Sequence, residues 1–500
     1  MKQSAAVRDI LKLVSGSVAA RLISIAALML FTRTLSKTEV AIFPVYLMLG
    51  GVANLFFNFG IFPIFVKLLP SLLRSDRQKA CDLVLTGAVL ILFGTVLVSI
   101  LTAAFADRVA VTVLGTAAYG HAVRVMCIGF VAFAIAKLVE HVMWGRGQYG
   151  MTSVLQLLDA AVRPVTCVAL YLLMGFEGIV IALVIAQSIV AAASVWCVRD
   201  FFRGMRLRFY PLGALFQQSY PFYFESYLMY ARGDGDNWLV TFFLGPAFLA
   251  EYYVAKTLYS SVIMFSTAVD KVVAERFARE AHVPDVLAAR AGETHRHLSQ
   301  FAPPLMLFLI TLTPFIMTVV GGDRYRSAAG PAMILLVLAL QQILTIPIDR
   351  SVFAGTPSFF RLLKTLIESV GVMAGAIVMA PLAGINGIAA GRLLGQGLAA
   401  LFGYELIRRK LGIHLGLRKL AISLACSLPG TILILALAPV AHGAAAAIGE
   451  AVASALVWLG VFAATTFLVD RETLVGAWRY AVGKLRDRSV PYSLGRTVHD

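Results

Sequence analysis

The chain has 500 residues, of which 59% are hydrophobic and only 14% are charged, with a mean hydropathy of +0.83. A soluble domain carries about 25% charged residues, so this composition excludes an ordinary soluble protein and indicates one that lies in a bilayer. The formal net charge of +16 would suggest a nucleic acid partner in a soluble chain, but the hydropathy makes that the weaker interpretation.

Runs of about 20 apolar residues, the length that a helix needs to cross the hydrocarbon core, recur along the chain. They predict an all-α polytopic membrane protein with about fourteen transmembrane helices. The expected spans are residues 14–33, 40–66, 82–105, 122–143, 151–174, 177–198, 217–243, 247–269, 300–320, 328–348, 361–381, 385–406, 419–439 and 445–468. The first run contains Arg21, unlike the apolar centre of a cleaved signal peptide, so we expect a true span.

Basic residues in short loops predict the orientation of these spans. We number the gaps between successive spans in chain order. If the N-terminus is cytoplasmic, the two termini and the even-numbered gaps are cytoplasmic, and they hold 31 of the 43 Lys and Arg residues. The odd-numbered gaps hold five. We therefore expect both termini on the cytoplasmic side. The remaining seven basic residues fall inside spans. The five cysteines lie mostly within apolar runs, which indicates packing residues, and we expect no metal and no cofactor.

An internal repeat emerges when the chain is aligned with itself at an offset of 209 residues. Gly175 then meets Gly384 and Gly178 meets Gly387, and Asp159 falls on Glu368. Six spans separate the two copies, so the halves have the same orientation, as in transporters whose halves are related by an axis along the membrane normal. Chance matching of apolar helices is the alternative. The repeat predicts two six-helix lobes around a central cavity, at 1–205 and 206–412, with accessory spans at 413–469 and a cytoplasmic tail at 470–500.

Four segments of the chain carry recognisable motifs, namely GSVAARLISIAALMLFTRTLSKTEVAIFPVY (16–46), DNWLVTFFLGPAFLAEYYVAKTLY (236–259), GGDRYRSAAGPAMILL (321–336) and APLAGINGIAAG (380–391). These motifs resemble those of Wzx-type polysaccharide flippases, and the resemblance extends from about residue 12 to 412. Within the first, Arg33, Leu35 and Tyr46 match the family, whereas Val40 and Ala41 stand where a glycine is usual. The group belongs to the multidrug/oligosaccharidyl-lipid/polysaccharide exporter superfamily, so drug antiporters and peptidoglycan-precursor flippases remain alternatives.

This resemblance implies a function and a setting. The substrate would be an oligosaccharide on undecaprenyl diphosphate, moved from the cytoplasmic to the periplasmic leaflet of the bacterial inner membrane for exopolysaccharide, capsule or O-antigen synthesis. Membrane lipids, a polysaccharide polymerase and chain-length proteins would be partners, and the chain would not be an enzyme. Such a substrate needs cations for its diphosphate.

The basic residues inside spans are the candidates for this role, because an intramembrane charge is costly unless it faces water or a partner. Arg21 and Arg232 lie in the first spans of the two lobes, where the related fold borders its cleft, and are the best candidates for the anionic head group. Arg392 and Lys256 are further candidates. Two other cations have acidic neighbours three or four residues away and are expected to pair locally, as Lys137 with Glu140 and Arg163 with Asp159.

The span at 217–243 carries the most unusual string of the chain, with Glu225, Arg232, Gly233, Asp234, Gly235 and Asp236. One hypothesis is a hinge, in which the glycines bend or unwind the helix beside a cavity and the carboxylates bind a coupling proton or sodium ion. The alternative is an Arg232 to Asp236 salt bridge that only packs the helix. A membrane glycosyltransferase is a rival hypothesis, since Asp234 and Asp236 form an Asp-x-Asp pair, a spacing that can hold a divalent metal.

Overall fold

The structure is a computed structural model that describes residues 21–469 except 57, 204, 205, 207, 281, 282 and 438–442. In this part of the chain every regular element is helical. The start of the first expected span (14–20) and the tail expected at 470–500 lie outside the described residues.

The helices follow one another through short connections. After a helix at residues 21–34, they are α2 (Lys37–Val40), α3 (Ile42–Leu55), α4 (Ile61–Ser75), α5 (Arg77–Ala104), α6 (Ala106–Leu114), α7 (Gly120–Gly145), α8 (Tyr149–Met174), α9 (Phe176–Val198), α10 (Leu212–Leu244), α11 (Pro246–Glu280), α12 (Pro284–Gly321), α13 (Ala329–Gly355), α14 (Ser358–Leu411), α15 (Arg418–Leu437) and α16 (Ala444–Val469). Three short 3₁₀ turns, at Ala117–Tyr119, Arg199–Phe201 and Asp323–Ala328, join some of them.

By length and composition, ten helical segments of the described chain are suited to crossing a membrane, so the predicted polytopic all-α class is confirmed and the count of fourteen is not. One reason is α14, which contains two expected spans (361–381 and 385–406) with non-helical backbone between them at Ala383 and Gly384. Another is α10, which is not among the ten and carries four charged residues.

The expected single span at 40–66 is wrong, because the chain is divided there into α2, α3 and α4. Phe59 and Gly60 both have positive φ, at 47° and 71°. A Cβ on Gly60 would lie 2.4 Å from the backbone oxygen of Ser219 on α10. The break therefore lets α4 approach the α10 backbone, a tertiary requirement that hydropathy does not reveal.

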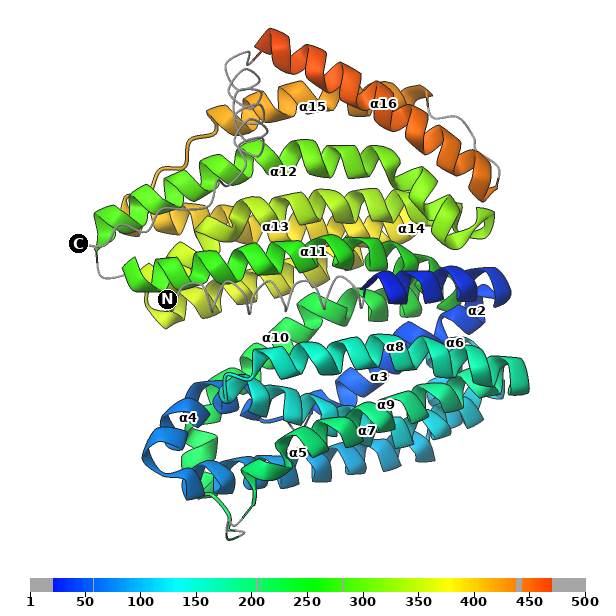
Figure 1. Cartoon of the computed structure of the whole chain (residues 1–500), viewed down its shortest axis with the longest axis vertical. Coiled ribbons are helices and arrows are strands. Elements are labelled where there is room, and N and C mark those ends of the chain that lie inside the picture. The colour runs from blue at the N-terminus through cyan, green and yellow to red at the C-terminus, as the bar shows by residue number, and fades with distance from the viewer. Residues whose placement is uncertain are drawn as a thin grey trace, which may run out of the picture.

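Figure 1 shows two groups of helices, with α3 to α9 forming the first lobe and α11 to α16 lying in the second, while α10 runs between them. The helix at 21–34 and α2 belong early in the sequence but lie beside α11 of the second lobe. α15 and α16 cover the outer side of α12. The exact domain boundaries at 205 and 412 remain predictions.

Backbone geometry confirms the repeated turn at Gly175 and Gly384. Gly175 precedes α9 with φ 63° and ψ −141°, and Gly384 precedes the second half of α14 with φ 56° and ψ −131°. A Cβ on Gly178 would lie 2.0 Å from the oxygen of Leu170, and one on Gly387 would lie 1.9 Å from the oxygen of Met379. Each pair of positions differs by the same 209 residues, so both hairpins turn in the same way.

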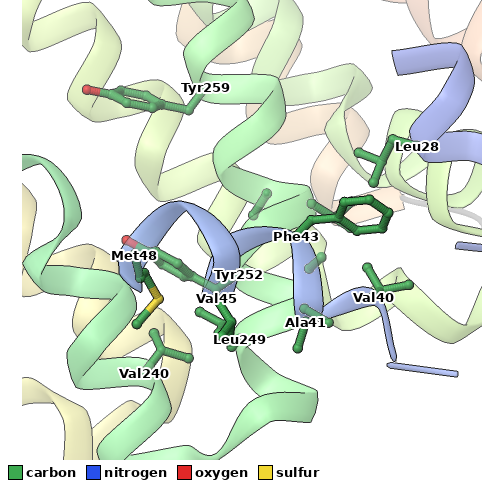
Figure 2. Packing of buried hydrophobic residues seen from close by; sticks show 14 of the residues in the cluster. Leu28, Val40, Ala41, Phe43, Val45, Met48, Val240, Leu249, Tyr252 and Tyr259 are labelled. Carbon is green, nitrogen blue, oxygen red and sulfur yellow. The ribbon is translucent and has the colours of Figure 1, made fainter. Parts of the chain in front are cut away.

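The two lobes pack together at one end. Figure 2 shows side chains from α2 and α3 facing side chains of α10 and α11, all within one buried hydrophobic cluster. They include Val40, Ala41, Phe43, Val45 and Met48 on one side and Val240, Leu249 and Tyr252 on the other. Lys37 also forms an ion pair with Glu251, and Thr32 Oγ1 donates to the Val320 carbonyl at 2.8 Å. Basic-residue topology predicts that this closed end is periplasmic.

Candidate functional site

A cavity of about 480 Å³ lies between α10, α11, α13 and α14. We call it the charged cavity. Its lining includes Glu225, Arg232, Tyr259, Asp270, Gln342, Asp349, Arg350, Arg361, Lys364, Glu368, Arg392 and Gln396. Asp349 and Arg361 are more than two-fifths exposed, so this end of the cavity is accessible, and it is the end whose basic residues predict the cytoplasmic side.

Each of the five cations that line the charged cavity forms an ion pair with a carboxylate. The pairs are Arg232 with Glu368 (2.8 Å), Arg350 with Asp270 (2.6 Å from Nε), Arg361 with Glu225 (2.8 Å), Lys364 with Asp349 (2.9 Å) and Arg392 with Asp236. The cavity is therefore close to neutral, and an anionic ligand must compete with these carboxylates. Arg232, Arg350 and Arg361 keep 28 to 44% of their side chains exposed, which makes them the accessible cations.

Behind the cavity lies a buried charge cluster formed by Asp236, Tyr252, Lys256 and Arg392. Asp236 is fully buried, and its Oδ1 accepts from Lys256 Nζ at 2.8 Å. Its Oδ2 accepts from the Tyr252 hydroxyl at 2.9 Å and from Arg392. Two cations thus share one buried carboxylate, so removing that carboxylate would leave like charges together in a place of low dielectric constant.

In this conformation α10 runs as one helix from Leu212 to Leu244, so the hinge at its glycines stays a prediction. The two glycines have other effects. The Gly233 carbonyl accepts an additional hydrogen bond from Lys256 Nζ at 2.7 Å. A Cβ on Gly235 would lie 2.6 Å from the Met373 sulfur, so this glycine allows α14 to approach α10. Gly235 thus serves packing between helices, whereas a Cβ on Gly233 would meet nothing within 4 Å.

The Arg232 to Asp236 salt bridge considered from sequence is wrong. Arg232 pairs with Glu368 on α14, 136 residues away in the chain, whereas Asp236 faces Lys256 and Arg392. Glu225, expected on the same face, pairs with Arg361. The reason is that α10 has helices on several sides, so each charge finds a closer partner on a neighbouring helix than along its own.

The cation predictions have different outcomes. Arg232 and Arg392 line the charged cavity, although Arg392 is only 5% exposed. Lys256 belongs to the buried charge cluster, where it contacts Asp234 and Asp236, while its sequence neighbour Glu251 pairs with Lys37 instead. None of these contacts tests a role in binding, which stays a prediction.

Arg21 is separate from that group. Its guanidinium donates to the Ser261 hydroxyl at 2.7 Å, to the Thr257 carbonyl at 2.6 Å and to Ser260, all on α11. It does not line the charged cavity, nor the cavity among α3, α7, α8, α9 and α10, nor the groove between α5, α7 and α9 that are described below. In this conformation Arg21 therefore holds the first helix against α11, and its head-group role remains a prediction.

A second cavity, of about 440 Å³, lies between α3, α7, α8, α9 and α10. Its lining includes the two locally paired cations, and both predicted pairs are confirmed, Lys137 with Glu140 and Arg163 with Asp159, each at 2.7 Å. Asp159 and Gln187 line this cavity, and their repeat partners, Glu368 and Gln396, line the charged cavity. The repeat thus places one polar cavity in each lobe, with different faces of α10 contributing to the two.

Sequence reasoning missed three of the cations that line the charged cavity. Arg350, Arg361 and Lys364 were assigned to a cytoplasmic gap, where basic residues record only topology. The neighbouring Asp349 was no clear signal, because acidic residues such as Asp76 and Asp200 occur in other gaps of this kind. Glu368 was noticed only as the repeat partner of Asp159.

The geometry bears on the glycosyltransferase hypothesis. Asp234 lines the second cavity and is 46% exposed, whereas Asp236 is buried in the charge cluster. The Lys256 ammonium contacts both carboxylates, at 3.4 and 2.8 Å, and so occupies the place that a shared metal would need. Among the described residues, no group of three or more His, Cys, Asp or Glu side chains could hold a metal ion.

Arg392 is positioned by a hairpin of glycines within α14. A Cβ on Gly391 would lie 2.2 Å from the carbonyl carbon of Gly375, and one on Gly395 would lie 2.2 Å from the nitrogen of Val372. The two halves of α14 therefore pack backbone against backbone, through glycines spaced four residues apart, as in transmembrane helix pairs with small residues at the interface. This close approach brings Arg392 to Asp236 on α10.

Two lobes of membrane-spanning helices with a polar cavity in each define a membrane transporter fold. The sequence matches the family described as polysaccharide biosynthesis protein over residues 20–330, which is more than half of the chain. The chain therefore belongs to this family, and the resemblance to Wzx-type flippases is confirmed. No curated protein matches the sequence.

Solved structures share the fold. The lipid II flippase MurJ in an inward closed conformation aligns with a TM-score of 0.74 and 12% identity, over 92% of this chain and 99% of its own. An inward-facing multidrug resistance MATE family transporter of the MOP superfamily aligns with a TM-score of 0.64 and 15% identity, over 78% of this chain and 94% of its own. A MOP superfamily transporter from Pyrococcus furiosus aligns with a TM-score of 0.57 and 13% identity, over 81% of this chain and 95% of its own.

Proposed function

We propose that the chain is a flippase that moves an undecaprenyl-diphosphate-linked oligosaccharide from the cytoplasmic to the periplasmic leaflet of the bacterial inner membrane. The observation that carries the proposal is the charged cavity, where Arg232, Arg350 and Arg361 are partly exposed between membrane-spanning helices. Guanidinium groups present paired N–H donors that match phosphate oxygens, so these residues suit a diphosphate.

The ion pairs of the cavity explain how binding could be reversible. A diphosphate that pairs with Arg232 and Arg361 displaces Glu368 and Glu225, so the net gain is small and release stays possible. Gln342 and Gln396, which are joined by a hydrogen bond of 2.6 Å, and Tyr259 add polar groups for sugar hydroxyls. Family membership supports a glycan as the cargo.

The closed end bears on how the cargo would be released. The lobes are held together by the hydrophobic cluster and by Lys37 with Glu251 at the end predicted to be periplasmic. Release on that side requires these contacts to separate while the accessible end of the cavity closes, as alternating access demands. We expect a polymerase and chain-length proteins to receive the product.

A cell-based experiment tests the proposal. Deleting the gene should remove the surface polysaccharide and cause its lipid-linked precursor to accumulate, and the wild-type gene should restore the polymer. Arg232→Gln should restore little of it at equal membrane abundance. The control is Arg108→Gln, since Arg108 lies on α6 outside all three cavities. Full complementation by Arg232→Gln would contradict the cavity assignment.

A second candidate, translocation of a peptidoglycan precursor, is favoured by the fold similarity to the lipid II flippase. Both substrates present a diphosphate, so the charged cavity suits either. Complementation separates them, because a peptidoglycan-precursor flippase would support growth of cells depleted of their own lipid II flippase, whereas a polysaccharide flippase would not.

A further inference from the structure

A groove of about 970 Å³ runs along the outer surface of the first lobe between α5, α7 and α9, and it is about twice as large as either polar cavity. We call it the α5–α9 groove. Small side chains create its concave shape, among them Ser99, Ala103, Ala132, Ala191 and Ala192. Larger apolar residues such as Ile100 and Ile128 border it and are more than half exposed.

The second lobe shows what happens to the equivalent surface. At the repeat offset, Ser99 of α5 corresponds to Phe308 of α12, and Phe308 packs against Trp458 of α16 with ring centroids 5.2 Å apart. Thr102 corresponds to Thr311, which donates to Thr431 of α15 at 3.1 Å. α15 and α16 therefore cover this face in the second lobe. In the first lobe no segment of the described chain covers the groove.

The ends of the groove carry arginines. Arg199 lies at the end predicted to be cytoplasmic, with its guanidinium carbon 3.3 Å from the centre of the Trp196 ring. Arg124 lies on α7 toward the other end and pairs with Asp107 at 2.7 Å. Arginine and tryptophan together are typical anchors at the membrane interface. Arg199 Nε is 3.9 Å from Asp200 Oδ1, and its guanidinium carries further N–H donors that match phosphate oxygens.

We propose that the α5–α9 groove binds an acyl chain of an anionic phospholipid whose phosphate contacts Arg199. The half of the groove that begins at Arg199 has a fitting length, because its lining from Ser188 to Arg199 spans about 17 Å, close to one leaflet of a hydrocarbon core of about 30 Å. The lining on α5 and on α7 near Arg124 belongs to the other half. A transmembrane helix of another protein would also cover an apolar groove, but it would not need a cation at the end. The bound lipid would cover this face of the first lobe, as α15 and α16 cover the equivalent face of the second lobe.

Photolabelling of the full-length protein tests this site. The probe is phosphatidylglycerol with a diazirine in one acyl chain, added to protein in a neutral detergent and followed by peptide mapping. Wild-type protein should be labelled mainly on α7 and α9, and unlabelled phosphatidylglycerol should compete at least tenfold better than phosphatidylcholine. Ala192→Trp should fill the groove and reduce this labelling roughly tenfold, and Arg199→Gln should remove the preference for phosphatidylglycerol.

The control variant is Ile189→Trp, which is on α9 but does not line the groove. It should leave the labelling unchanged, and unchanged melting temperatures would show that each variant is folded. Labelling spread evenly over the lipid-facing helices, or unaffected by Ala192→Trp, would overturn the proposal. The proposal would also be overturned if native mass spectra showed a dimer for the wild type and a monomer for Ala192→Trp. That result would show that a second copy of the chain occupies the groove.

Discussion

The buried charge cluster makes a sharp prediction about stability. Replacing Asp236 by Asn keeps the shape of the side chain but removes the carboxylate that Lys256 and Arg392 share. The two cations then lie together behind the charged cavity, with the half-exposed Asp234 as the nearest acid to Lys256. Asp236→Asn should therefore destabilise the protein far more than an ordinary polar substitution.

The size of the effect follows from the burial. Asp236 is fully buried and Arg392 is 5% exposed, and breaking such a pair costs about 3 to 5 kcal/mol. With an unfolding entropy of about 2.1 cal/mol/K per residue, the melting temperature should fall by roughly 3 to 5 °C. Arg392→Gln in addition removes one of the unpaired cations, so the double variant should recover part of that loss.

This decrease in melting temperature can be measured on the purified protein in detergent, with thermal unfolding followed by intrinsic fluorescence. The matched control is Asp200→Asn, because Asp200 is 70% exposed and its nearest cations are 3.9 and 4.0 Å away. It should shift the melting temperature by less than about 1 °C. Two results would contradict the described ion pairs of Asp236. One is a wild-type melting temperature for Asp236→Asn. The other is a double variant with Arg392→Gln whose melting temperature falls by the full sum of the two single decreases.

Two further predictions concern the repeat and the closed end. Gly178→Ala and Gly387→Ala should each destabilise the protein by about 1 to 3 kcal/mol, because the new Cβ would meet a backbone oxygen within 2.0 Å. The control is Gly449→Ala, which should be neutral or stabilising in the same thermal melts because its new Cβ would meet nothing within 4 Å. Lys37→Met should lower the melting temperature because Glu251, only 5% exposed, loses its cation, and Glu251→Gln in the same chain should restore it. Equal melts for Gly387→Ala and Gly449→Ala would argue against the close approach, and no rescue by Glu251→Gln would argue against the ion pair.

Much of the fold can be predicted from the sequence because a bilayer imposes simple rules. Apolar runs predicted α5, α7, α8 and α9 of the first lobe with ends close to those observed, whereas the short α6 was not predicted. The repeated glycines, such as Gly175 and Gly384, predicted the shared turn because few residues adopt that backbone conformation. The break at Gly60 was missed, since it depends on contact with α10 and not on hydropathy.

The partners of charged residues could not be predicted in the same way. Arg232 has Asp236 one helical turn away, yet it pairs with Glu368 on another helix. Spacing along one helix correctly predicts the ion pair of Arg163 with Asp159. It fails at the charged cavity, where four helices meet and bring acidic residues from different helices together. Pair choice at such a point depends on the tertiary arrangement, which periodicity does not contain.

Reconstituted flipping tests the central claim most directly. The full-length protein would be placed in liposomes with a fluorescent oligosaccharide on undecaprenyl diphosphate, and a membrane-impermeant quencher would report the leaflet of the label over time. Wild-type protein should move this lipid between leaflets. Arg232→Gln should lower the flipping rate roughly 10- to 100-fold, because a hydrogen bond to a charged group contributes about 1.5 to 3 kcal/mol. Arg108→Gln should behave as the wild type. Movement of the lipid at the same rate in Arg232→Gln, or no movement by folded wild-type protein, would contradict the account.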